Sequence, residues 1–493
     1  MPTRRPTGST SRSRWIALAV LCTGMLMVIL DGNIVTVALP SIQRDLDFSP
    51  ADLTWTINAY MIAFGGALLL AGRLGDLIGR RRMFLGGLAV FVAASLLCGL
   101  AGGQEVLIAA RFLQGLGGAA ASGVSLGMII MLFPEPRQRG TAIGVFAFTG
   151  AAGASIGQVL GGVLTDALSW HWIFFVNAPI GALALGLAVR YIAADRGLGL
   201  RTGADVPGAL LVTAGLMLTV YTIVETSRYG WLSVRTLGLA VVAVALLGGF
   251  VVRQATAAAP LLPLRVFRSR AVSGANIVQV LAISAMFGFQ IMISLYLQQV
   301  QGYDAWANGI AMLPAALMIG GVALLLSARL NARFGEYRML LTGLALLTVG
   351  IGLLVRVPVG AVYVRDILPT MLLGGGFGLA TSALTSLGMS GARADDAGVV
   401  SGLFTTTQQV GGALGVAVLS TLAAGRTAGL AADGATRAAA LTGGFGLAFA
   451  VGTGLLVAAL VVAAVVLRPR AEACPSGADR ASAPAGQTAE ATA

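Results

Sequence analysis

The sequence contains no lysine, one histidine and three cysteines among its 493 residues. A phosphate-binding loop of the Gly-x-x-x-x-Gly-Lys type needs a lysine, so an ATP-driven pump with that loop is excluded. One histidine and three scattered cysteines provide neither a metal-ligand cluster nor a disulfide framework. Because no catalytic dyad stands out either, we expect no enzyme, no metal site and no organic cofactor.

Charge is scarce as well. Charged residues make up 11% of the chain and hydrophobic residues 57%, whereas a soluble protein has about 25% charged residues. Apolar runs of 18 or more residues recur, and each can cross the roughly 30 Å hydrocarbon core of a lipid bilayer. The net charge of +12 comes from arginines in the loops between these runs, so it indicates membrane topology and not nucleic-acid binding. The composition therefore predicts an all-α integral membrane protein.

We predict fourteen transmembrane helices, and the distribution of arginine supports this number. With both termini in the cytoplasm, the cytoplasmic segments hold 24 arginines and the outer segments hold 7. Such a bias is typical of membrane proteins, whose cytoplasmic loops are rich in positive charge. The predicted spans have cores at 15–38, 54–74, 83–102, 105–132, 139–166, 172–194, 204–225, 234–253, 271–296, 305–329, 337–356, 363–389, 396–423 and 442–467.

An internal repeat divides the chain. The glycine-spaced, charged stretch 72–82 recurs at 328–338, and extending both copies to Leu88 and Leu344 gives 8 identities in 17 positions. A second pair of glycine-rich stretches matches at an offset of 258 residues. These repeats predict a duplicated bundle. We expect a cytoplasmic tail at 1–14, six-helix halves at 15–194 and 271–467, two inserted helices at 204–253, and a disordered cytoplasmic tail at 468–493.

Few charged residues lie within the predicted spans, where each costs about 2.5–3.5 kcal/mol on insertion scales. Asp31 is halfway along the first span, and Arg111 is near the start of the fourth. Burial favours the protonated form of a carboxyl group, so Asp31 is a candidate proton site or a counter-charge for a cationic substrate. Arg111 is its candidate partner. The alternatives are a structural, hydrogen-bonded carboxylate and an arginine that extends to the membrane interface.

Three further sets of residues are candidates for function. The charged loop carries Gly72, Asp76, Gly79 and Arg80, which predict either a latch of exchangeable ion pairs or a simple positive-inside anchor. Helix 139–166 carries Gly153, Gly157, Gly161 and Gly162 on one face, which predicts close approach of a neighbouring helix. Polar side chains within spans could line a substrate cavity, and they are Asn33, Gln114, Gln158, Asn177, Asn276, Gln279, Gln290 and Gln408.

These motifs together resemble the major facilitator superfamily, and within it the fourteen-helix drug:proton antiporters. The stretch 30–40 resembles that group's first-helix signature, 72–82 the superfamily's loop motif, Arg111 to Gly117 its fourth-helix motif, and Gly153 to Gly162 its antiporter motif. The likeness covers 15–467. One departure is that Gln158 stands where the antiporter motif usually has proline after its second glycine, which puts the usual kink in doubt.

The resemblance implies a proton-coupled exporter of hydrophobic or cationic drugs or antibiotics in the bacterial plasma membrane. The proton motive force would replace a cofactor, and the two halves would rock around a site near the midplane. Asp31 would bind a proton from outside and release it inside. An importer or symporter on the same fold is the alternative. We expect a monomer with small molecules, protons and lipid as its partners.

Overall fold

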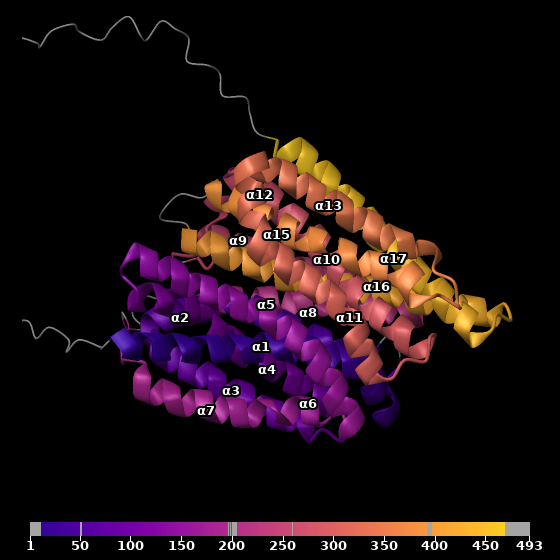
Figure 1. The fold of residues 1–493 in the computed structure, drawn as a ribbon, viewed down its shortest axis with the longest axis horizontal. Coiled ribbons are helices and arrows are strands. Elements are labelled where there is room, and N and C mark those ends of the chain that lie inside the picture. Colours follow the sequence, from indigo (N-terminus) through magenta and orange to yellow (C-terminus); the bar gives the residue numbers. More distant parts are fainter. Residues whose placement is uncertain are drawn as a thin grey trace, which may run out of the picture.

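The computed structural model describes residues 11–49, 52–195, 197, 199, 205–258, 260–391 and 397–468. Most of the two predicted tails, 1–14 and 468–493, lies outside the described residues. Every regular element in the described part of the chain is helical. The helices form an elongated bundle of two groups (Figure 1).

The first group contains the helices that precede residue 192, drawn in indigo to magenta in Figure 1. Its sixth span is broken at Val176 into a short helix and a longer one. The members are α1 (Ser11–Asp45), α2 (Trp55–Ile78), α3 (Arg80–Gly99), α4 (Gln104–Leu132), α5 (Pro136–Ala167), α6 (Trp172–Phe175) and α7 (Asn177–Tyr191). We call these helices the N-terminal group.

The second group contains the helices that follow residue 269, and we call it the C-terminal group. Two of its spans are irregular, because π-helical segments at Val322–Leu326 and Tyr363–Ile367 interrupt or precede the α-helix. The members are α10 (Arg270–Gln299), α11 (Ala305–Gly321), α12 (Ser327–Phe334), α13 (Glu336–Leu353), α14 (Leu368–Leu373), α15 (Gly375–Ser390), α16 (Ala397–Ala432) and α17 (Arg437–Val466).

Two helices, α8 (Val206–Tyr229) and α9 (Val234–Thr256), come between the groups in sequence. Helix α8 packs on α9 and also on α2 and α16, which meet where the two groups adjoin. Asp205 joins the pair, because its carboxylate accepts hydrogen bonds from Arg253 Nε at 2.9 Å and Gln254 Nε2 at 2.7 Å. On the other side of the bundle, α5 contacts α11.

Eleven helices of the described residues are long and apolar enough to cross a membrane, or twelve if the bent α2 is one span. This is fewer than the fourteen spans expected from the sequence. Helix α11 has only 17 residues, because the π-helical segment after Gly321 ends it. Helix α5 is also not among the eleven, although it has 32 residues.

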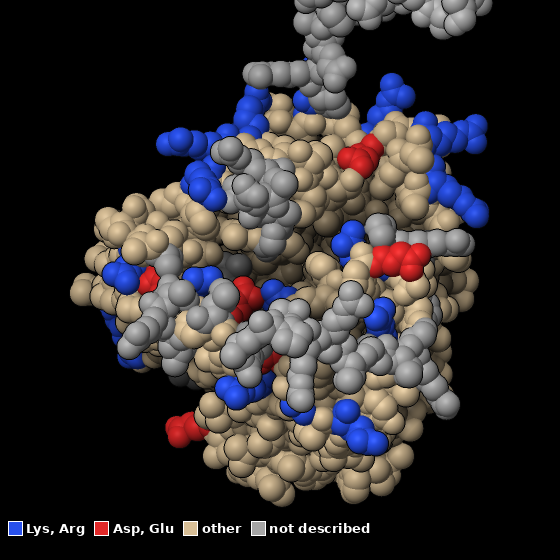
Figure 2. Space-filling model, turned by 90° about the vertical axis from the view of Figure 1, so that its left-hand side faces the viewer, with Lys and Arg blue, Asp and Glu red and all other residues tan. Residues whose placement is uncertain are grey.

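The two ends of the bundle differ in charge. We call the end with loop 72–82 and its repeat 328–338 the arginine-rich end, and the other the opposite end. Helix α1 begins and α17 ends on the arginine-rich side (Figure 1). Figure 2 looks onto this end and shows blue arginine side chains around a recess between the two groups.

The repeat seen in the sequence has matching backbone geometry. Gly79 separates α2 from α3 with φ +105°, and Gly335 separates α12 from α13 with φ +85°. Each glycine donates its N–H to the carbonyl four residues earlier, at 3.0 Å for Gly79 and 2.9 Å for Gly335. Positive φ disfavours other residues, so both turns depend on glycine. The duplicated sequence therefore builds the same helix–turn–helix twice.

Glycines also bring matching helix pairs together. A Cβ at Gly157 of α5 would lie 2.8 Å from the carbonyl oxygen of Leu30 in α1, and one at Gly161 would lie 2.8 Å from that of Ile34. In the repeat, a Cβ at Gly411 of α16 would lie 3.0 Å from the carbonyl oxygen of Val280 in α10. These distances are too short for a side chain. Gly157 and Gly161 therefore make a backbone-to-backbone contact with α1. Gly162, predicted on the same face, instead faces α11, where a Cβ would lie 2.6 Å from the Ala305 carbonyl oxygen.

Replacing Gly161 by alanine should lower thermal stability. The new methyl group would meet the α1 backbone, which cannot rotate away, and overpacking of this kind costs about 1–3 kcal/mol. Gly86→Ala is the matched control, since nothing lies within 4 Å of its Cβ position. We expect thermal unfolding of purified protein in detergent to show a lower midpoint for Gly161→Ala and an equal or higher one for Gly86→Ala. Equal midpoints for Gly161→Ala and the wild type would contradict this packing.

Candidate functional site

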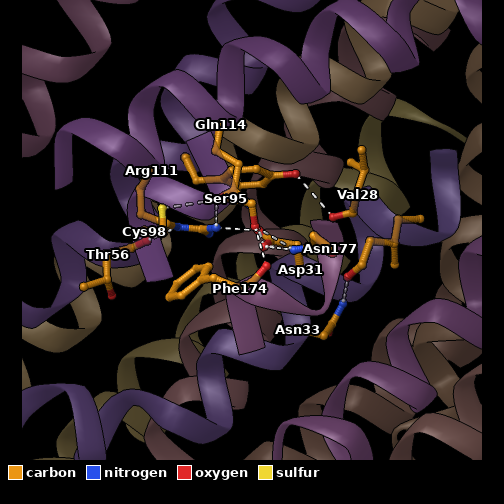
Figure 3. A network of polar contacts seen from close by, with 12 residues as sticks. Val28, Asp31, Asn33, Thr56, Ser95, Cys98, Arg111, Gln114, Phe174 and Asn177 are labelled. Atoms are coloured by element: carbon orange, nitrogen blue, oxygen red, sulfur yellow. Dashed lines mark hydrogen bonds and ion pairs between the residues drawn. The ribbon is translucent and has the colours of Figure 1, made fainter. Parts of the chain in front are cut away.

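A fully buried ion pair lies in the middle of the N-terminal group (Figure 3). Arg111 Nη1 of α4 donates to Asp31 Oδ2 of α1. The residues are 1% and 0% exposed. Breaking a buried pair by removing one charge typically costs about 3–5 kcal/mol, because the other charge is left without a counter-charge. Asp31 and Arg111, which the sequence proposed as partners, are therefore in direct contact.

Asp31 accepts two more hydrogen bonds, both at Oδ1. Gln114 Nε2 donates to it at 2.7 Å and Asn177 Nδ2 at 3.0 Å. Both carboxylate oxygens therefore accept hydrogen bonds, and every donor to them is an N–H group.

Arg111 is held by several groups besides Asp31. Its Nε donates to the backbone carbonyl of Thr56 in α2 at 2.8 Å, and its Nη1 to Gln114 Oε1 at 2.7 Å. The guanidinium lies 4.4 Å from the centre of the Tyr60 ring, a cation–π contact. Gln114 is three residues after Arg111 on the same face of α4, so one helix supplies both groups.

A second layer of polar contacts fixes Asn177. Its Nδ2 also donates to Ser95 Oγ of α3 at 3.0 Å, and the Ser95 hydroxyl donates to the carbonyl of Phe174 at 2.9 Å. Asn177 is the first residue of α7, just after the break in the sixth span. The break therefore turns an amide toward Asp31, and α1, α2, α3, α4, α6 and α7 all contribute to the network (Figure 3).

This arrangement changes the expected site in one respect. Gln114 and Asn177 were predicted to line a substrate cavity, but both are fully buried against Asp31 inside the N-terminal group. They belong to the charge network because their amide N–H groups satisfy the buried carboxylate. The sequence could not separate the two positions, since an amide in an apolar helix suits either.

Asn33 and Gln290 do lie between the groups, where Gln290 Nε2 donates to Asn33 Oδ1 at 3.1 Å. Asn33 is two residues from Asp31 and therefore on another face of α1. Further hydrogen bonds join α1 to α10 toward the opposite end: Gln298 donates to the Val37 carbonyl and Gln299 to Gln43 Oε1, both at 3.2 Å. These bonds close the two groups together from the middle to the opposite end.

The remaining predicted cavity residues are spread over three helices. Gln158 of α5 is 7% exposed, and its Oε1 has no partner. Asn276 of α10 accepts from the Thr407 hydroxyl of α16 at 2.9 Å, within the C-terminal group. Gln279 of α10 is 6% exposed, and Gln408 of α16 is partly exposed. Among the described residues, no hydrogen bond joins any of these four to Asn33 or Gln290.

At the arginine-rich end, Asp76 and Arg80 form an ion pair across the α2–α3 turn, with Arg80 Nη2 2.9 Å from Asp76 Oδ1. Arg80 Nη1 also donates to the carbonyl of Gly127 in α4 at 3.1 Å. Gly72 faces α4 too, since a Cβ there would lie 3.5 Å from the Gly123 carbonyl oxygen. The loop thus ties together the ends of α2, α3 and α4.

Asp195 is a participant that sequence reasoning missed. It lies after α7, and its carboxylate accepts the backbone N–H of Arg80 at 2.6 Å and of Arg81 at 3.0 Å. Burial acts to raise the pKa of Asp195, but the backbone hydrogen bonds and the positive charge of Arg80 together lower the pKa below its usual value. The sequence signal that could have pointed to this contact is the pair of glycines at 197 and 199, which allows close approach to α2: Gly199 N–H donates to the Leu77 carbonyl at 3.0 Å.

Among the described residues, no group of three or more histidine, cysteine, aspartate and glutamate side chains could hold a metal ion. The buried charge of the site is balanced by Arg111 alone. The arrangement can link two events: a proton bound at the Asp31 carboxylate would remove the counter-charge of Arg111, and the guanidinium would then change its position.

Comparison with known proteins adds relatives over most of the chain. It is 38% identical over 468 residues to the puromycin resistance protein of Streptomyces alboniger, covering 93% of this chain and 92% of the relative. It is 38% identical to the cephamycin export protein of Amycolatopsis lactamdurans, with 96% of each chain covered. The tetracenomycin C resistance and export protein of Streptomyces glaucescens is 34% identical, with 84% and 76% covered.

Solved structures with the same fold are more distant. A bacterial homologue of the human lysosomal transporter Spinster matches with a TM-score of 0.66 at 15% identity, covering 94% of this chain and 98% of that one. A peptide transporter of the POT family matches with the same TM-score at 17% identity, covering 94% and 99%. The family model described as Major Facilitator Superfamily matches residues 21–416. The chain therefore belongs to the Major Facilitator Superfamily, as a multi-pass membrane transporter and not an enzyme.

Proposed function

We propose that the protein exports hydrophobic drugs or antibiotics across the bacterial plasma membrane in exchange for protons, by alternating access. The observation that carries proton coupling is the buried Asp31–Arg111 pair. Relatives at 34–38% identity named for antibiotic resistance or export support the direction and the substrate class. The proton motive force supplies the energy, with about 2.3 kcal/mol per charge for each 100 mV of membrane potential.

The coupling step follows from the charges. Protonation of Asp31 removes the negative charge that balances Arg111, and a buried unpaired charge is costly. The guanidinium then has to find new partners, and the groups it already contacts are the Thr56 carbonyl and the Tyr60 ring of α2. Movement of α2 would change its packing on α16 across the boundary between the groups. A proton at Asp31 thereby favours a different arrangement of the two groups.

The transmembrane organisation is part of the same proposal. The twelve candidate spans make fourteen when two more are added: α5, and the continuous run of α11, the π-helical segment Val322–Leu326 and α12. The six-helix halves are 15–194 and 271–467, with 204–253 inserted between them. The tails 1–14 and 468–493 are cytoplasmic, which places the arginine-rich end inside, in keeping with the positive-inside rule. The transporter works as a monomer.

The charged loop acts as a latch in this proposal. Asp76 and Arg80 contact α2, α4 and each other, and the backbone of Arg80 contacts Asp195. In the described part of the chain, none of these hydrogen-bond partners comes from the C-terminal group. The recess at this end (Figure 2) corresponds to a released latch. Engagement with the C-terminal group belongs to the other conformation, and the glycines at 72 and 79 allow the close turn.

Asp31→Asn should abolish proton-driven export. Asparagine keeps the size of the side chain but cannot carry the charge that balances Arg111. We expect at least about a tenfold loss of dye efflux in inverted vesicles with an imposed proton gradient, the equivalent of about 1.4 kcal/mol or more. The double variant Asp31→Asn, Arg111→Gln removes both charges and separates loss of coupling from misfolding, because it leaves no unpaired charge.

The matched control is Asp205→Asn, which breaks a buried carboxylate's contact to Arg253 outside the proposed proton site. This variant should retain gradient-dependent efflux. Efflux that remains in both Asp31 variants and still follows the proton gradient would show that the proton binds elsewhere. If the proton gradient drives uptake of the dye instead of export, the protein is an importer.

Asp195→Ala should release the start of α3. The amides of Arg80 and Arg81 lose their acceptor, so hydrogen–deuterium exchange at both positions should become faster at neutral pH. Because the pKa of Asp195 is lowered on folding, its stabilisation is present above the usual carboxyl value of 3.8 and is lost as the pH falls below it. The difference between variant and wild type in thermal midpoint should shrink over that range. Glu105→Ala, an exposed acid at the opposite end, should change neither measurement.

A further inference from the structure

A cavity of about 230 Å³ lies between the two groups near the opposite end. Helices α1, α2, α10, α16 and α17 form its walls, so both groups contribute. It begins at Leu39 of α1, eight residues beyond Asp31, which corresponds to about 12 Å along a helix. Typical ligand pockets measure about 300–1,000 Å³, so this one suits a small molecule or one part of a larger molecule.

The lining is apolar and contains no ionisable side chain. Its polar members are amides and hydroxyls: Gln43, Thr54, Gln299, Ser420 and Thr427. The two glutamines are bonded to each other across the boundary between the groups, with Gln299 Nε2 donating to Gln43 Oε1 at 3.2 Å. A cationic ligand would find no counter-charge in this cavity, whereas an uncharged ligand would lose little on leaving water.

One hydroxyl in the wall has no partner. Ser420 of α16 is 6% exposed, and its Oγ makes no hydrogen bond. Many helical hydroxyls bond to the carbonyl four residues earlier, as Ser125 does to Ala121 and Thr453 does to Phe449. Other buried hydroxyls without a partner are those of Ser122, Thr165, Thr370 and Thr406, but only that of Ser420 lines this cavity. A buried hydroxyl without a partner costs roughly 1–3 kcal/mol, and a ligand group within the cavity would recover it.

Helix α2 connects this cavity with the proton site. The Thr56 carbonyl and the Tyr60 ring contact Arg111, while Thr54 and Ile57 in the same two turns line the cavity. Asp31 itself is not part of the lining. A proton and a ligand would therefore act on one helix from different sides, without sharing the carboxylate.

We propose that this cavity binds uncharged, largely apolar compounds through Ser420 and the glutamine pair, on the opposite half of the transport path. The inference rests on the proposed export function and narrows its substrate class. Occupation of the cavity separates Gln43 from Gln299, and so loosens the contact that closes the opposite end. The proton at Asp31 is coupled to this site through α2, and cations compete neither for the cavity nor for its lining.

The test is equilibrium dialysis of purified protein in detergent with radiolabelled chloramphenicol as the uncharged probe and tetraphenylphosphonium as the cation. Ala424→Leu fills the cavity and should weaken chloramphenicol binding at least tenfold. Ser420→Ala removes one hydrogen bond and should weaken it about two- to tenfold. Ala432→Leu, at an exposed position of the same helix and outside the cavity lining, is the matched control and should bind as the wild type does.

The outcomes separate this inference from the proposed function. Asp31→Asn should keep chloramphenicol binding while losing gradient-driven efflux. Unchanged chloramphenicol binding in Ala424→Leu would refute the cavity, whereas loss of efflux in Asp31→Asn would still support antiport. No saturable chloramphenicol binding by the wild type overturns the inference, as does tetraphenylphosphonium binding that Ala424→Leu weakens equally. A co-purified phospholipid that native mass spectrometry finds only in the wild type, with chloramphenicol binding unchanged in Ala424→Leu, would identify the occupant as lipid.

Discussion

The buried pair of Asp31 and Arg111 is the constraint on which the N-terminal group depends. Two charges without water require hydrogen-bond partners, and α2, α4 and α7 supply them directly. Gln114 and Asn177 provide the other hydrogen bonds of the carboxylate, and Asn177 follows directly after the break between α6 and α7. The same contacts make the carboxylate sensitive, because one added proton leaves the arginine without its counter-charge.

Close glycine contacts provide the surfaces on which such a change can act. Gly157 and Gly161 set α5 directly on the backbone of α1, and Gly411 does the same for α16 on α10. Between the groups, α5 meets α11 and α2 meets α16. Side chains interlock little at glycine surfaces, so helices can stay in contact while they shift. The duplication thus gives both groups the same kind of internal contact, while the described residues show a buried Asp–Arg network only in the first.

The inserted pair α8 and α9 is connected to the two groups in two ways. Asp195, just before the pair, caps the start of α3, and α8 itself lies over the α2–α16 contact. The linker and the charged loop therefore hold each other in place. Helix α8 therefore contacts both groups at their boundary, and α9 packs on α8.

The sequence by itself determined the helical membrane class and the internal repeat, and it proposed Asp31 and Arg111 as partners and the α5 glycines as positions of close contact. These follow from composition, period and the cost of charge in an apolar span, which are local properties of the chain. Only the tertiary structure decided that Gln114 and Asn177 face Asp31, that Asn33 faces Gln290, and that Asp195 caps α3. Each of these depends on helix rotation or on a contact across more than a hundred residues. The direction in which an amide side chain points cannot be predicted from its position in an apolar run.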